Sequence, residues 1–236
     1  MPTPSLRRGL PAILLALLVF LLARPAHAGV DLEVSSILGD LGPSQGEILV
    51  RIRNPERREL RGFVAIEAIE ERSAARVLAR TPFVVGAATT TFVKVPVAAP
   101  AYGSEIAAVA RDESGGEFGR ASRSSHGSAS FVLFEIPPRD TRLLPLHVDG
   151  RAIPLLRRTG GSAAVTTAPA DEAAGASILP DRPTSYTHVA LVIVPASELD
   201  ALDGAGREAL VAWVMGGGSL AIAIREPADL VRPALI

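Results

Sequence analysis

The sequence predicts two domains, an all-β immunoglobulin-like sandwich followed by a small, incomplete α/β domain with a parallel sheet. Between residues 30 and 122, short runs alternate apolar and polar side chains between turn residues, which is typical of antiparallel strands with one buried face. Beyond residue 126 the apolar runs become continuous, as in strands that are covered on both faces. We place the domains at residues 29–126 and 127–236.

The first 28 residues have the pattern of a secretory signal peptide. Arg7 and Arg8 precede an apolar run from Leu10 to Leu22, and a small-x-small cleavage pattern ends at Ala28. The run is short for a bilayer core of about 30 Å, so an uncleaved anchor is the weaker alternative. A bacterial lipid anchor needs a cysteine, and the chain has none. We therefore expect an exported protein, in the periplasm or on the outer face of the cytoplasmic membrane, with membrane association only through an uncleaved signal or a partner.

The charge of the mature chain excludes one class of partner. Removing residues 1–28 takes away three arginines and no acid, which changes the net charge from −1 to about −4. Such a chain has no electrostatic footprint for nucleic acid.

The strands of the first domain follow one another at short, regular spacing. Ile48, Val50 and Ile52 would face one way, toward the core. The side chains of Glu47, Arg51 and Arg53 would face the other way. Asn54-Pro55 then forces a turn. Seven short strands at this spacing suggest an antiparallel sandwich. Besides Glu47 to Arg53 and the run after Asn54-Pro55, they are Val30 to Ile37, Arg76 to Val85, Thr89 to Val97, Glu105 to Arg111 and Glu117 to Ser122.

The stretch "APAYGSEIAAVARDESGGEFGR" resembles the last hairpin of an immunoglobulin-like or fibronectin-like module. Tyr102 stands where such folds often place a tyrosine that hydrogen-bonds back across a corner between strands. The alternative is an ordinary, partly buried aromatic residue without this role. The G-x-S-x-G match around Ser44, near the start of this domain, is not expected to be a nucleophile elbow, because a strand rather than a helix follows it.

The second domain is expected to alternate strands with helices and loops. A helix ends at the three glycines that precede the last strand, whereas phosphate loops run strand, glycines, helix. We expect Asp203 to cap this helix, Leu210, Trp213 and Val214 to face the sheet, and Gly216 to take the left-handed conformation at its end. No cofactor is expected. The elements are strands Phe131 to Ile136, Ala163 to Thr167, Val189 to Val194 and Leu220 to Ile224, helices Asp140 to His147 and Gly204 to Met215, and a loop-rich stretch from Pro169 to Tyr186.

The stretch "YTHVALVIVPASELDALDGAGREALVAWVMGGGSLAIAI" resembles the class I glutamine amidotransferase-like domains of exported, often membrane-anchored bacterial proteins. Many of those domains follow an immunoglobulin-like module, so the resemblance implies the same order here. The enzymes of that class use a cysteine nucleophile, which this chain lacks, so the resemblance does not imply glutaminase activity.

Candidate ligand-binding residues follow the strands of the second domain, because open α/β sheets bind ligands beyond the carboxyl ends of their strands. The competing explanation is that these polar residues simply lie in solvent-exposed loops and bind nothing. His188 would lie at the opposite, amino end of its strand, and His126 and His147 share no metal-ligand spacing with acids, so no metal is expected. The candidates are Arg139, Asp140, Ser197, Glu198, Arg225 and Glu226, with Thr166 and Thr167 at the weaker strand.

Two functions remain open at this point. The first is a non-catalytic cell-envelope module that binds a protein partner. The alternative is a periplasmic serine hydrolase that uses Ser197, assisted by Glu198 or Asp140. Because few residues follow Ile224, we also expect exposed apolar surface beyond Leu220 to Ile224, in a truncated or split product or in a sheet that a partner completes.

Overall fold

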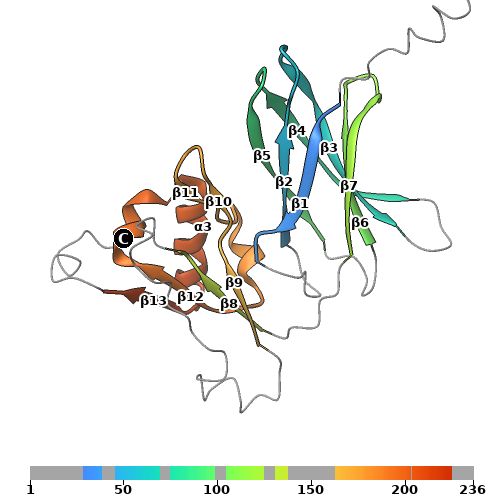
Figure 1. The fold of residues 1–236 in the computed structure, drawn as a ribbon. Coiled ribbons are helices and arrows are strands. Elements are labelled where there is room, and N and C mark those ends of the chain that lie inside the picture. The colour runs from blue at the N-terminus through green and yellow to red at the C-terminus, as the bar shows by residue number, and fades with distance from the viewer. Residues whose placement is uncertain are drawn as a thin grey trace, which may run out of the picture.

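A computed structural model describes residues 29–38, 46–69, 75–98, 105–124, 131–137, 163–202 and 204–224. Within these ranges the chain is mostly β, with two antiparallel sheets, one parallel sheet, a small hairpin and one α-helix (Figure 1). The signal segment, the boundary near residue 126, the helix expected at 140–147, and Ser44, Tyr102 and Asp203 lie outside them.

The N-terminal half forms two antiparallel sheets that pack face to face, which we call the sandwich. One sheet has the order β1 (Asp31–Ser36), β2 (Gly46–Arg53), β5 (Thr90–Val97), and the other β4 (Arg76–Val85), β3 (Leu60–Ile69), β6 (Glu105–Arg111), β7 (Glu117–Ser124). The side chains that alternate inward from both sheets make one core, including Ile48, Val50, Ile66, Val95 and Ala108. The strand assignments from period-two alternation are thereby confirmed.

The C-terminal half contains a four-stranded parallel sheet in the order β13 (Leu220–Ala223), β12 (Val189–Pro195), β8 (Phe131–Glu135), β9 (Ala163–Thr167). Helix α3 (Gly204–Met215) connects β12 to β13 and packs Ala209, Leu210, Trp213 and Val214 into the core of this half. No described helix is long and apolar enough to span a membrane.

The stretch expected as loop from Pro169 to Tyr186 contains more structure than its sequence indicates. Strands β10 (Ala170–Asp171) and β11 (Ala176–Ser177) form a hairpin, and the 3₁₀ segment η1 (Pro183–Tyr186) follows. A second 3₁₀ segment, η2 (Ala196–Ala201), comes directly after β12. These elements are too short for periodicity to reveal.

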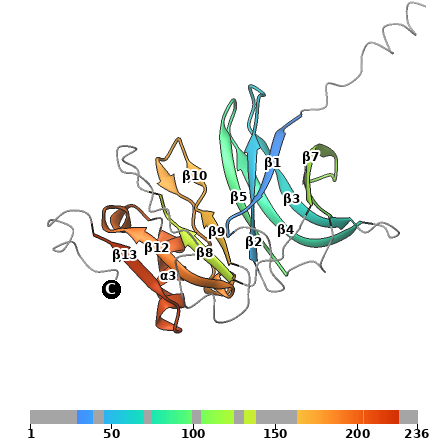
Figure 2. The ribbon, with the colours of Figure 1, turned by 60° about the horizontal axis from the view of Figure 1, so that its bottom comes forward.

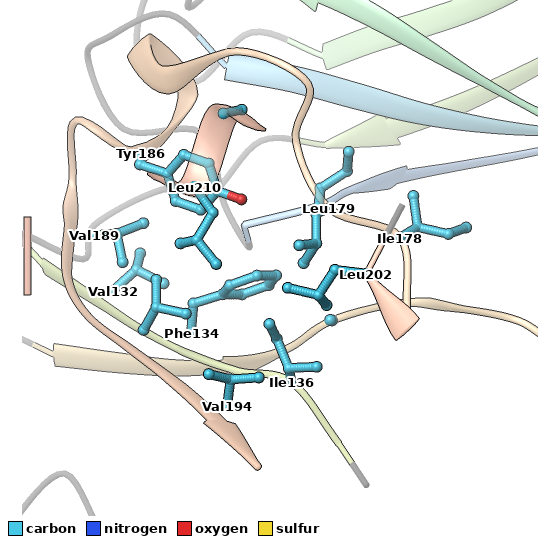
Figure 3. Packing of buried hydrophobic residues seen from close by; sticks show 14 of the residues in the cluster. Val132, Phe134, Ile136, Ile178, Leu179, Tyr186, Val189, Val194, Leu202 and Leu210 are labelled. Atoms are coloured by element: carbon cyan, nitrogen blue, oxygen red, sulfur yellow. The ribbon is translucent and has the colours of Figure 1, made fainter. Parts of the chain in front are cut away.

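The second apolar core crosses the junction between the two halves. Phe134 lies at its centre, with Tyr186, Leu179 and Leu210 around it (Figure 3). Ile37 and Leu49 from the sandwich belong to the same cluster, and Leu38 and Phe92 pack against it. The two halves therefore share buried surface.

The three glycines after α3 form the C-terminal cap of the helix. The residue expected to take the left-handed conformation, Gly216, is not the one that does so. Gly217, with φ of 103°, takes that conformation in place of Gly216. The Gly218 N–H donates to the Trp213 carbonyl and the Gly217 N–H to that of Val214, both at 3.0 Å, which is a Schellman motif. The helical hydrogen bonding continues one residue further than expected, since the Gly216 N–H still bonds to the Ala212 carbonyl. The glycines serve backbone geometry, as the order helix, glycines, strand predicts.

Candidate functional site

The parallel register brings the carboxyl ends of three strands to one edge of the sheet. Glu135, the last residue of β8, pairs with Ile193 of β12 and with Thr167 of β9. The Ile136 N–H donates to the Ile193 carbonyl at 2.9 Å, and the Ala168 N–H donates to the Glu135 carbonyl at 2.8 Å. Polar residues that follow these strands therefore lie along a common edge.

Two buried carboxylates occupy this edge. Glu135 and Glu198 are each 5% exposed, and neither lacks an interaction partner. Glu198 belongs to η2, so the expectation of a solvated loop is wrong for this residue. Ser197 beside it is half-buried. Of the other candidates, Arg139, Asp140, Arg225 and Glu226 lie outside the described residues.

Glu135 is the residue of this edge that sequence reasoning missed. It lies within the apolar run "FVLFEI", where a single acid is itself a signal, because a buried carboxylate needs partners. Across the described ranges, no group of three histidines, cysteines or acids could hold a metal. His188 precedes β12 at the opposite edge, and its buried Nε2 has no hydrogen-bond partner among the described residues.

A cleft of about 530 Å³ separates the outer face of the β1-β2-β5 sheet from the β10-β11 hairpin. Figure 2 shows β10 lying beside β5 across this junction. The register places Glu33, Arg51 and Phe92 abreast on three neighbouring strands, so this face of the sheet forms one wall. The hairpin forms the other. The lining residues are Glu33, Ser35, Leu49, Arg51, Thr90 and Phe92 from the sandwich and Pro169, Ala170, Asp171, Glu172 and Ala173 from the hairpin.

The charges in the cleft are arranged unevenly. Arg51 Nη1 pairs with Glu33 Oε2 at 3.3 Å. Asp171 Oδ1 accepts the N–H groups of Ala173 and Ala174, at 3.0 and 3.2 Å, and so fixes the turn of the hairpin. Glu172 makes no such contact with the residues that the structure describes and is exposed. Among the residues that the structure describes, Glu172 is thus the lining carboxylate without a partner, and the ring of Phe92 lies on the opposite wall.

A polar contact next to the cleft fixes how the halves meet. Glu47 is 4% exposed, and its Oε2 accepts the Asp181 N–H at 2.8 Å. Lys94 Nζ donates to Asp181 Oδ1 at 2.5 Å. Desolvation by burial raises the pKa of Glu47 above its ordinary value of 4.5, against the lowering effect of the Asp181 N–H. The side expected to face solvent is covered here by the C-terminal half.

A second hollow lies on the opposite face of the sandwich. Glu67 Oε1 accepts from Arg111 Nη2 at 3.1 Å, and its Oε2 accepts from Arg120 Nη1 at 3.2 Å. Arg80 stacks over the Phe63 ring at 5.1 Å. Glu67 is thus paired with two guanidinium groups, and Arg80 is stacked on an aromatic ring, so these charged side chains have partners within the sandwich.

Comparisons with known proteins give this chain no function. No protein-family model and no curated protein matches it. A superoxide reductase (neelaredoxin) from Ignicoccus hospitalis is 11% identical over 41% of this chain and 80% of its own, with a TM-score of 0.31. A Paenibacillus cycloisomaltooligosaccharide glucanotransferase is 16% identical over 47% of this chain and 16% of its own, at 0.30. A β-glucuronidase of glycoside hydrolase family 2 is 11% identical over 78% of this chain and 20% of its own, at 0.27.

Proposed function

We propose that this protein is a non-catalytic, exported cell-envelope module that binds a protein partner in the cleft between the sandwich and the β10-β11 hairpin. In this proposal an immunoglobulin-like domain (29–126) is followed by a degenerate glutamine amidotransferase-like domain (127–236). The signal pattern at residues 1–28 directs the chain to the periplasm or to the outer face of the cytoplasmic membrane. The observation that carries the proposal is the cleft, which both halves line.

Two properties of the cleft favour binding. Its volume is in the range of ligand sites, and both apolar and polar side chains line it. The apolar cluster at the junction and the contact between Glu47 and Asp181 hold its two walls together. A site held open in this way costs little conformational entropy on binding.

The glutamine amidotransferase-like part of the proposal rests on residues 186–224. The helix, glycines and strand that carry the resemblance correspond to α3, its Schellman cap and β13. The class-defining cysteine is missing, and for that reason we assign this half a binding role in place of catalysis.

Site-specific cross-linking tests the binding role, because the chain has no cysteine and a single thiol can be placed at will. Ala173→Cys puts a photoactivatable thiol reagent in the cleft, and Val84→Cys puts it on an exposed position of β4, away from the cleft. In intact envelopes of the native host, we expect a discrete protein adduct from Ala173→Cys alone. Equal adducts from both variants, or none from either, contradict the proposal.

One observation keeps a second function in view. Ser197 follows the carboxyl end of β12, next to the buried Glu198, where an α/β enzyme would hold catalytic groups. A serine hydrolase that uses Ser197 is therefore the alternative proposal. Substitution of Ser197 distinguishes this alternative from the binding module.

A further inference from the structure

We infer that the cleft selects a peptide segment that presents a lysine or arginine beside an apolar side chain. This inference rests on the proposed function, which assigns a protein partner to the cleft, and it names the chemistry of that partner.

The charges of the cleft determine the basic component. The ionisable side chains that line it are three carboxylates and one guanidinium. Arg51 is paired with Glu33 at the surface, and Asp171 accepts backbone N–H groups of its own turn. Glu172 is left exposed on the hairpin, so a cationic group is the complement that the cleft lacks.

The opposite wall determines the apolar component. Phe92 lies on the outer face of the sheet above the buried Leu49, and Pro169, Ala170 and Ala173 line the cleft from the hairpin. Phe92 is half-buried, so part of its ring remains open to a ligand. A side chain of the size of leucine would bury apolar surface here, which an acidic or purely polar segment could not do.

The fold places the acidic and the apolar part of the cleft on opposite walls. Glu172 is in the loop between β10 and β11, whereas Phe92 is in β5 on the other side of the cleft. Neighbouring side chains of an extended segment point in opposite directions. An extended peptide can thus direct its basic residue to the hairpin and its apolar neighbour to the sheet.

Fluorescence anisotropy of labelled hexapeptides tests this preference on the chain from Gly29 to Ile236. The probe is GAKLAG, with GAELAG and GAKSAG as matched peptides that change only the charge or only the apolar side chain. We expect GAKLAG to bind most tightly and the binding to weaken as salt is raised from 50 to 300 mM. Glu172→Gln should weaken it about threefold, as expected for one exposed ion pair.

Two further variants complete the design. Glu172→Lys should reverse the order of GAKLAG and GAELAG, and Glu208→Gln, an exposed acid on α3, should change nothing. Equal binding of all three peptides, or no binding, overturns the inference. If Ala173→Cys still cross-links a partner, the proposed function survives that result; if it does not, both proposals fail.

Discussion

The carboxylate of Glu47 accepts the backbone N–H of Asp181 at 2.8 Å, and this hydrogen bond joins the sandwich to the C-terminal half. The two residues are 134 positions apart in sequence. Glu47 is almost fully buried, whereas Lys94 binds the side chain of Asp181 at the rim. A buried acid is costly unless it is satisfied, so the protonation state of this carboxyl group affects the stability of the folded chain.

Replacing Glu47 with glutamine should remove a pH dependence of stability. Burial raises the pKa of Glu47 in the folded state, so the folded chain holds this proton more tightly than the unfolded chain does. Its stabilising contribution is complete below the unfolded pKa, near 4.5, and is lost as the pH rises through the higher folded pKa. Thermal unfolding should give Glu47→Gln and wild type equal midpoints at pH 4.

At pH 7 the variant should unfold roughly 2–4 °C higher, the shift expected for about 1 kcal/mol in a chain of this size. Glutamine keeps an acceptor oxygen for the Asp181 N–H and carries no charge to desolvate. Glu208→Gln, on the exposed surface of α3, is the control and should follow wild type at both pH values. A difference of the same size at pH 4 and pH 7 would contradict the role of Glu47.

Lys94 offers a direct chemical probe of the same junction, because it is the only lysine of the chain. Its side chain is 18% exposed and bonded to Asp181. An amine-reactive reagent should therefore modify Lys94 more slowly than the terminal amine, as followed by mass spectrometry of peptides. Asp181→Asn should accelerate the modification several-fold, and Asp200→Asn, at an exposed position of η2, should leave it unchanged. Equal rates in wild type and Asp181→Asn would mean that the ion pair does not protect the amine.

The cap of α3 should tolerate no side chain at its last glycine. A Cβ on Gly218 would lie 2.3 Å from the Trp213 ring, which stacks on Tyr186 at 5.4 Å between ring centroids. Gly218→Ala should therefore cost about 1–3 kcal/mol and move the fluorescence of Trp213, the only tryptophan. Gly204→Ala meets no atom within 4 Å and should be neutral or slightly stabilising. Unchanged stability and fluorescence in Gly218→Ala would show that the indole moves aside freely.

Export makes a separate prediction about the mature N-terminus. Cleavage after Ala28 would leave Gly29 first, directly before Val30, which is buried and donates its N–H to the Phe118 carbonyl at 3.1 Å. Intact-mass analysis of protein from the native host should give a chain that begins at Gly29. A product that retains Arg7 and Arg8 would mean that the segment acts as an anchor.

The sequence predicts strands and α3 because each repeats one pattern over several residues. Strands β4, β6 and β9 and helix α3 begin and end at the predicted residues. The hairpin β10-β11 and the 3₁₀ segments have two to six residues, so tertiary contacts decide their structure. Gly217 replaces Gly216 as the left-handed residue because nothing local separates three identical glycines.

The candidate site is predicted less well, for a physical reason. Periodicity assigns Glu47 to the outer face correctly, but burial of that face depends on residues more than a hundred positions away. The sequence likewise predicts that Glu198 is an acid of an exposed loop, whereas packing around η2 buries it. The cleft itself depends on how the β10-β11 hairpin lies against the sandwich, and no local sequence pattern predicts that arrangement.

Substitution of Ser197 separates the binding module from the hydrolase, with Glu198 as the structural reference. Glu198 is 5% exposed, so Glu198→Ala should lower stability by about 1–3 kcal/mol through its lost partners, whatever the function. Ser197 is half-buried, and Ser197→Ala should change the midpoint of thermal unfolding little. If the protein is a binding module, purified wild type and Ser197→Ala should give the same background rate with p-nitrophenyl acetate and with a fluorogenic peptide substrate. Turnover by wild type that Ser197→Ala abolishes at unchanged stability would establish the hydrolase in place of the binding module.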